Sequence, residues 1–66
     1  MKYQIRKLLI NQWSYGLWID EFSDSMEISK EVFDFLRSEQ EDSLKRKDVW
    51  AYLNDSSPFQ IRAVKE

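Results

Sequence analysis

The sequence predicts a single α+β domain spanning residues 1–66, with a small antiparallel sheet and one or two helices packed on one face. Two observations predict this class. Segments of β-favouring residues lie near both ends of the chain, and a strong helix start lies between them. At 66 residues the chain has the length of one small domain. The predicted element order is ββα(α)β.

The first third of the chain is expected to form a β-hairpin. Apolar and polar side chains alternate over residues 3–10, and the apolar parity shifts at Leu8–Leu9, which indicates a bulge or a strand buried on both faces. Residues 17–22 are again β-favouring types. Gly16 is the only glycine of the chain, and glycine adopts the positive φ of tight turns most easily. The turn is therefore placed within residues 11–16.

A helix is predicted to begin at Lys30. Ser29 is a favourable N-cap residue, and Ile28 can pack on Phe33 as a hydrophobic staple. Phe33 and Phe35 are two positions apart, so on a helix they project about 200° apart. Both cannot enter one core, and one of them is expected to be exposed or used for binding.

The extent of the helical region is open between two interpretations. Acid-before-base pairs at four-residue spacing, beginning at Glu41 and at Asp42, favour one helix over residues 30–53. The wholly polar stretch of residues 37–43 favours two helices with a hinge, and we prefer this second interpretation.

The chain's only proline marks the end of the helical region. Pro58 follows a polar run and disfavours helical backbone at Ser57. Residues 59–64 then alternate between apolar and polar types, which predicts a half-buried strand that completes the sheet.

The composition excludes several kinds of site. The chain has no Cys and no His, which excludes disulfides, thiolate or imidazole zinc sites and Ser-His-acid triads. One glycine is too few for a glycine-rich phosphate loop. Asp20, Asp24 and Glu31 match part of a calcium-binding loop, but Phe22 and Ser25 break the pattern. We therefore expect no catalytic site, no cofactor and no metal.

No segment of the sequence resembles a membrane or export signal. The longest apolar runs, residues 8–10 and 17–19, are far too short for a spanning helix or a signal-peptide core. The absence of Cys is compatible with a reducing compartment. The expectation is a cytoplasmic protein without membrane contact.

The charge of the chain is unevenly distributed. The net charge is −2, but residues 20–42 hold nine acids against Lys30 and Arg37, a local net charge of −7. Such a field can steer a protein onto a basic groove, where exposed aromatics anchor the interface. The predicted partner-binding residues are Asp20, Glu21, Asp24, Glu27, Glu31, Asp34, Phe35, Glu39, Glu41 and Asp42.

This pattern predicts a non-catalytic protein-binding module, an acidic inhibitor or decoy of a basic, nucleic-acid-handling protein. Small size, lack of Cys and His and an acidic segment are typical of many small phage-encoded and mobile-element proteins, although no motif identifies a family. The first alternative is a regulator that contacts nucleic acid through a helix carrying Lys45, Arg46 and Lys47, next to Trp50 and Tyr52. The second alternative is a structural subunit or homodimer whose ten aromatics form a shared core.

Overall fold

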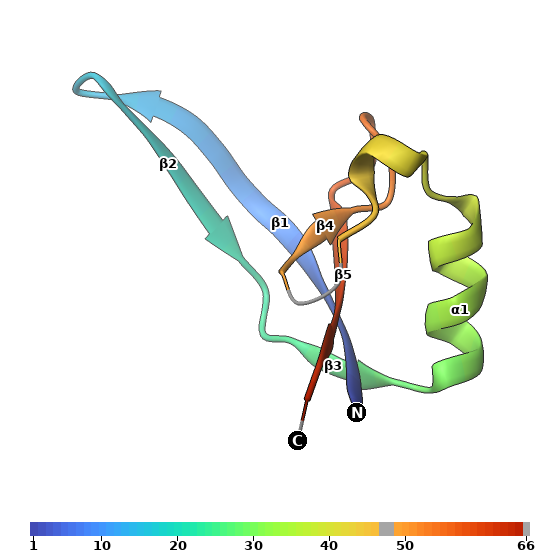
Figure 1. The fold of residues 1–66 in the computed structure, drawn as a ribbon. Coiled ribbons are helices and arrows are strands. Elements are labelled where there is room, and N and C mark those ends of the chain that lie inside the picture. Colours follow the sequence, from blue (N-terminus) through green and yellow to red (C-terminus); the bar gives the residue numbers. More distant parts are fainter. Residues whose placement is uncertain (47–48, 66) are drawn as a thin grey trace.

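An antiparallel sheet of five strands and one helix form the fold of residues 1–46 and 49–65, which the computed structural model describes (Figure 1). The elements are β1 Lys2–Ser14, β2 Leu17–Phe22, β3 Met26–Ile28, α1 Lys30–Glu39, the 3₁₀ turn η1 Asp42–Leu44, β4 Ala51–Tyr52 and β5 Phe59–Val64. The strands follow the order β2-β1-β5-β4, and β3 also pairs with β1. The predicted α+β class with an antiparallel sheet is confirmed.

The long strand β1 organises the sheet in two halves. Its first half lies between β3 and β5, and its second half pairs with β2 alone. A β-bulge separates the halves, since Leu8 pairs with Phe22 and Ile10 pairs with Glu21. Bulges bend and twist a strand, and beyond this one the hairpin leaves the body of the molecule (Figure 1). We call residues 9–22 the hairpin arm.

The turn of the arm lies within the predicted window. Tyr15 and Gly16 form it, and both have positive φ, 50° and 80°. Positive φ at both central residues is the signature of a type I′ turn, whose twist matches that of the two strands. The predicted hairpin is confirmed, and of the two alternatives for Leu8–Leu9 the structure has the bulge.

Helix α1 begins where its cap predicts. The Ser29 hydroxyl accepts a hydrogen bond from the backbone N–H of Val32 at 3.2 Å, and Ser29 itself is extended. The helix ends at Glu39 because Gln40 turns into extended backbone. The buried Gln40 side chain donates from Nε2 to the Tyr52 carbonyl at 2.7 Å, which ties the helix end to β4.

The predicted second helix is wrong. After Gln40 the described backbone forms only the short turn η1, and the next regular element is strand β4. Ala51 pairs with Ile61 of β5 and is buried, so pairing with the sheet and burial in it override local helix preference. Lys45 pairs with Asp42 at 3.1 Å instead of with Glu41 one helical turn away. Lys47 and Asp48 lie outside the described residues.

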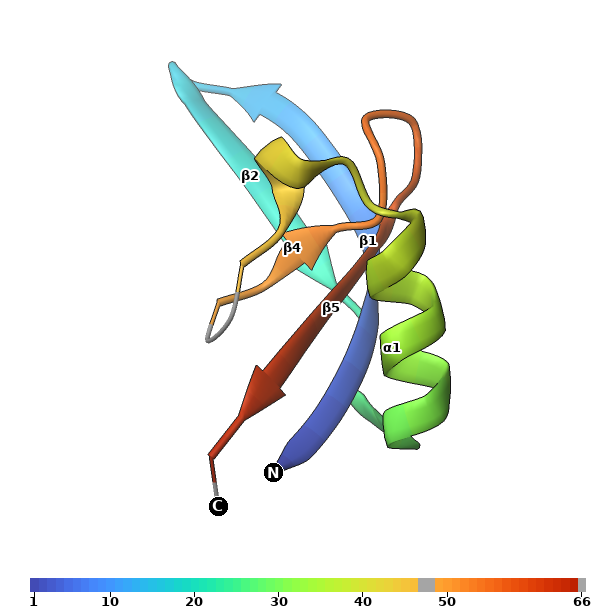
Figure 2. The ribbon, with the colours of Figure 1, turned by 45° about the vertical axis from the view of Figure 1, so that its right-hand side comes forward.

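Helix α1 lies against one face of the sheet (Figure 2), and a small apolar core lies between them. Its buried members are Phe33, Ile61 and Ala63, and half-buried side chains pack around them: Tyr3, Ile5, Ile28, Leu36 and Leu53. Ile28, which was predicted to pack on Phe33, packs against the cluster that contains Phe33, and the Tyr3 and Phe33 ring centroids are 4.8 Å apart. A core this small leaves a stability margin of a few kcal/mol.

Removing the N-cap hydroxyl by Ser29→Ala is expected to destabilise the fold by about 1 kcal/mol. Thermal unfolding followed by circular dichroism should show a midpoint lower by roughly 4–8 °C. Ser25→Ala is the matched control, because the exposed Ser25 makes no hydrogen bond within the described residues. Equal midpoints for the two variants would contradict the capping role.

Candidate functional site: the hairpin arm and an arginine cluster

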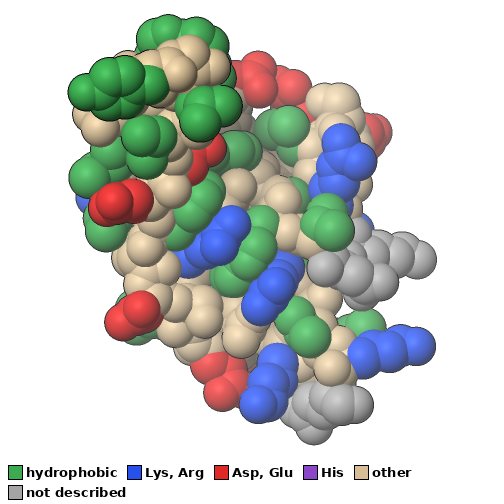
Figure 3. Space-filling view, turned by 90° about the vertical axis from the view of Figure 1, so that its left-hand side faces the viewer, with side chains coloured by type: hydrophobic (Ala, Val, Ile, Leu, Met, Phe, Trp, Pro, Cys, Tyr) green, Lys and Arg blue, Asp and Glu red, His purple; other side chains and the backbone are tan. Residues whose placement is uncertain are grey.

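The hairpin arm carries large apolar side chains on a two-stranded ribbon with no second layer among the described elements (Figure 1). Trp13 is 60% exposed, Trp18 is 64% exposed, and Tyr15 at the tip is fully exposed. Leu9, Ile10, Leu17 and Ile19 are exposed as well. Hydrophobic side chains consequently gather over the arm at the upper left of Figure 3.

Strand pairing divides the arm into two faces. Trp13 and Trp18 are cross-strand partners with ring centroids 5.4 Å apart in an edge-to-face arrangement. On the same face, the Asn11 amide donates to the Asp20 carboxylate at 2.6 Å. The opposite face presents the aliphatic side chains of Ile10, Leu17 and Ile19, together with Glu21. Each face therefore combines an apolar centre with one carboxylate.

A second cluster lies on the face of the sheet opposite α1. Side chains alternate along strands, so Gln4 and Arg6 of β1, and Gln60 and Arg62 of β5, point away from the core that holds Ile61. The pairing is reciprocal: Arg6 Nε donates to Gln60 Oε1, and Arg62 Nε donates to Gln4 Oε1, both at 2.8 Å. These two bonds fix the planes of both guanidinium groups.

Both arginines lie over the indole of Trp50. The guanidinium carbons of Arg6 and Arg62 are 4.4 and 4.5 Å from its ring centroid, and Arg6 is also 3.8 Å from the Phe22 ring centroid. Trp50 is half-buried here and is not a member of the core under α1. We call Arg6, Arg62, Trp50 and Phe22 the arginine cluster.

The arginine cluster holds two positive charges close together. Burial, and then the nearby charge of Arg62, lower the pKa of Arg6, while Tyr52 opposes this shift. Arginine stays protonated in proteins nonetheless. The ion pair found in residues 1–46 and 49–65 joins Lys45 to Asp42, and none within that part of the chain joins a carboxylate to either clustered arginine.

The sequence contained a signal for this cluster that our sequence analysis did not use. The tripeptide Gln-Ile-Arg occurs twice, at residues 4–6 and 60–62. The two copies lie antiparallel, with Ile5 opposite Ile61 and each glutamine opposite an arginine. The repeat therefore produces both the shared core contact and the reciprocal hydrogen bonds.

The acids predicted to bind a partner are spread over several elements. Asp20 and Glu21 lie on β2, Asp24 follows it, Glu27 lies on β3, Glu31, Asp34 and Glu39 lie on α1, Glu41 precedes η1, and Asp42 begins it. Figure 1 places β2 and α1 on opposite sides of the body, so the acids do not share one surface. Phe35 is 64% exposed while Phe33 is 4% exposed, which confirms that the two separate.

The predicted cationic helix is not formed. Lys45 and Arg46 are exposed in the irregular segment after η1, where the Arg46 carbonyl accepts a hydrogen bond from Arg37 Nη1 at 3.0 Å. Lys47, the third cation of the predicted contact, lies outside the described residues. Trp50 directly precedes strand β4, which begins at Ala51, and Tyr52 lies within that strand.

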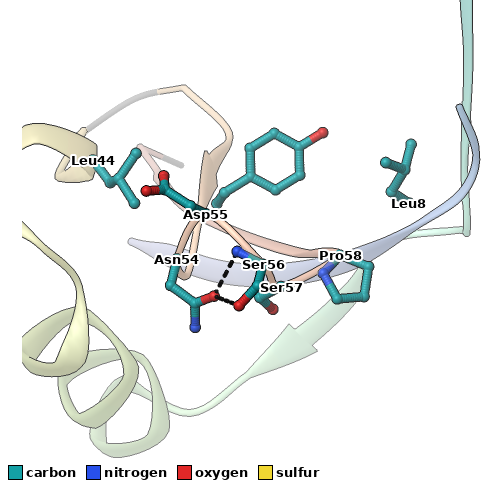
Figure 4. Close-up of a pocket in the computed structure, with 8 residues that line it drawn as sticks. Leu8, Leu44, Asn54, Asp55, Ser56, Ser57 and Pro58 are labelled. Carbon is teal, nitrogen blue, oxygen red and sulfur yellow. Dashed lines mark hydrogen bonds between the residues drawn. The ribbon is translucent and has the colours of Figure 1, made fainter.

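A further hollow borders the loop between β4 and β5, with Leu8 and Leu44 on its apolar side (Figure 4). Its polar groups stabilise the loop itself: Asn54 Oδ1 accepts hydrogen bonds from both the backbone N–H and the hydroxyl of Ser56, at 2.9 Å each. We therefore interpret this hollow as a consequence of the loop's conformation and not as a binding site. Within the described residues, no three acids converge in a way that could hold a metal ion.

Comparison of the chain with protein-family models, with curated proteins and with solved structures finds no significant match. Within the described residues, no helix has the length and apolar character that crossing a membrane requires. Inference about function therefore depends on the geometry of the hairpin arm and the arginine cluster.

Proposed function

We propose that this chain is a non-catalytic protein-binding module that docks through its hairpin arm. The observation that carries the proposal is the exposure of the arm's aromatic and aliphatic side chains on both faces of a ribbon standing away from the body. Small proteins rarely expose contiguous apolar surface without a binding role. Tryptophan and tyrosine, which the arm concentrates, are the residues that dominate binding energy at protein interfaces.

The geometry of the arm suits insertion into a groove. The arm is narrow, and its type I′ turn places Tyr15 at the leading end. Trp13 and Trp18 already contact each other, so little side-chain order has to be gained on binding. Strand β2 is also at the edge of the sheet, and a partner strand can add to such an edge.

The charges of the arm favour a basic partner. Asp20 and Glu21 place one carboxylate on each face, beside the apolar side chains that would be buried. The acids of α1 add to the negative field at longer range. These features support the inhibitor or decoy of a basic, nucleic-acid-handling protein, with its main contact on the arm rather than along the whole acidic segment.

Photo-crosslinking at the arm tests this function. Benzoylphenylalanine at Tyr15 is expected to give one dominant adduct with a basic protein when the chain is expressed in its source cells. The same probe at Phe35, which is also an exposed aromatic position, is the matched control and should give no such adduct. The adduct should weaken as salt is raised, because steering between charged surfaces is screened.

Two outcomes would contradict the proposal. One is adduct formation at Phe35 equal to that at Tyr15, which would place the contact on α1 or show it to be non-specific. The other is an adduct between two copies of the chain in purified protein, which would instead identify the arm as the interface of a homodimer, the structural alternative.

A further inference from the structure

We propose that the face of the sheet opposite α1 binds single-stranded nucleic acid, with Arg6 and Arg62 contacting its phosphates. This inference concerns a surface that shares only Phe22 with the hairpin arm, and it goes beyond the protein-binding function proposed above. It replaces the cationic helix predicted from the sequence with a cationic sheet face built from the two Gln-Ile-Arg segments.

The first argument is the orientation of the arginines. Nε of each guanidinium is used in the bond to a glutamine of the neighbouring strand, both guanidinium carbons lie over the Trp50 ring, and that of Arg6 also lies over the Phe22 ring. The Nη groups of Arg6 and Arg62 make no hydrogen bond within the described part of the chain. A guanidinium edge held in this way matches the oxygens of a phosphate.

The second argument is uncompensated charge. Burial and the nearby charge of Arg62 lower the pKa of Arg6, and no carboxylate of the described residues pairs with either arginine, so a bound anion would stabilise this cluster. Lys2 lies on the same face by strand alternation, two positions from Gln4. Figure 3 shows the result, with Lys and Arg side chains running down this face between hydrophobic ones.

The third argument distinguishes a single strand from a duplex. Planar groups alternate with cations in the arginine cluster, and unpaired bases stack on both aromatic rings and guanidinium planes. Duplex DNA is read by a cationic helix or ribbon that enters a groove. The arm is such a ribbon, but its charged side chains are Asp20 and Glu21, which a duplex would repel. Helix α1 is packed against the sheet and carries three acids against Lys30 and Arg37.

The acidic net charge of the chain would disfavour nucleic-acid binding if it were spread evenly, but it is not. The net charge of −2 sums over the whole chain. The acids of α1 lie on the covered side of the sheet and those of β2 lie on the arm. On the open face, Lys2, Arg6 and Arg62 stand against one acid of β3, Glu27, which is the cross-strand partner of Gln4. Screening over about 8–10 Å at ordinary salt lets the local field dominate.

Fluorescence anisotropy with labelled oligo(dT) and oligo(U) of about 15 nucleotides tests the inference. The double variant Arg6→Gln/Arg62→Gln is expected to bind at least about tenfold more weakly, and its salt slope should fall by about 1 per arginine removed. Lys30→Gln makes the same kind of charge change on α1 and should leave both quantities unchanged. A Trp13→Ser/Trp18→Ser variant of the arm should also bind the oligonucleotides normally. A result against nucleic-acid binding can therefore be distinguished from a result against protein binding by the arm.

A second variant keeps the test informative if the glutamine variant does not fold. Arg6→Lys/Arg62→Lys retains charge but loses the planar guanidinium groups, so we expect the wild-type salt slope with weaker binding. In a Trp13→Phe/Trp18→Phe background, Trp50 fluorescence should be quenched on adding oligo(dT). The inference is overturned if wild-type protein does not bind either oligonucleotide, if duplex DNA or inorganic polyphosphate binds equally well, or if Lys30→Gln weakens binding as much as the arginine variants.

Discussion

Replacing Phe33 by alanine is expected to leave most of the chain unfolded at room temperature. Phe33 is 4% exposed and is the only aromatic among the buried residues of the core. Truncation of a buried phenylalanine costs roughly 3–5 kcal/mol, because apolar contacts are lost and a cavity remains. A domain of this size has a margin of about the same magnitude, so circular dichroism should show loss of the cooperative unfolding transition.

Phe35 offers an unusually close control for this experiment. It has the same side chain, lies on the same helix two positions away, and is 64% exposed. Phe35→Ala is expected to change the free energy of unfolding by less than about 0.5 kcal/mol. If Phe35→Ala were instead the more damaging change, the helix would be packed on its opposite face and the core described here would be wrong.

Local signals in the sequence were sufficient for the first hairpin, for the start of α1 and for the last strand. Each depends on interactions between near neighbours: positive φ at Gly16, a cap at Ser29, and alternation over residues 59–64. Such interactions are largely independent of the rest of the chain. The structure therefore agrees with these predictions within one or two residues.

The prediction of a second helix was wrong because the conformation of the residues after Gln40 depends on contacts with residues distant in sequence. The polar residues after Gln40 form helices readily, but the Gln40 side chain is bound to the Tyr52 carbonyl and Ala51 is paired with Ile61. Neither contact has a local sequence signature. Pairing with the sheet edge also buries Ala51, and a continued helix would give up that burial.

The candidate sites show the same limit. Charge along the sequence predicted a site in residues 20–42, but the acids of this segment lie on several elements and do not share one surface. The arginine cluster joins residues from opposite ends of the chain, since Arg6 and Arg62 meet only through pairing of β1 with β5. The arm was predicted as a hairpin, yet its lack of a covering layer depends on where the rest of the chain packs.

Replacing Trp50 by alanine is expected to destabilise the fold by roughly 2–3 kcal/mol, less than a fully buried tryptophan would. Trp50 is half-buried, so part of the hydrophobic contribution is absent, but its ring supports both Arg6 and Arg62. Cation–π contacts of partly exposed groups contribute about 0.5–1 kcal/mol each. Urea unfolding should show a lower midpoint with an unchanged slope, and Trp50→Phe, which keeps a smaller ring, should lie between wild type and Trp50→Ala.

The salt dependence of these variants separates packing from charge. Without the indole, Arg6 and Arg62 retain their repulsion but lose the ring that both contact, so added salt should restore part of the stability lost by Trp50→Ala. Phe33→Ala, which removes packing alone, should gain no more from salt than wild type does. Oligo(dT) should raise the unfolding midpoint of wild type and Trp50→Phe, because a ligand that binds only the folded state stabilises it by mass action. Identical salt responses of Trp50→Ala and Phe33→Ala would show that Trp50 contributes only packing. They would also show that the indole ring does not offset repulsion between Arg6 and Arg62.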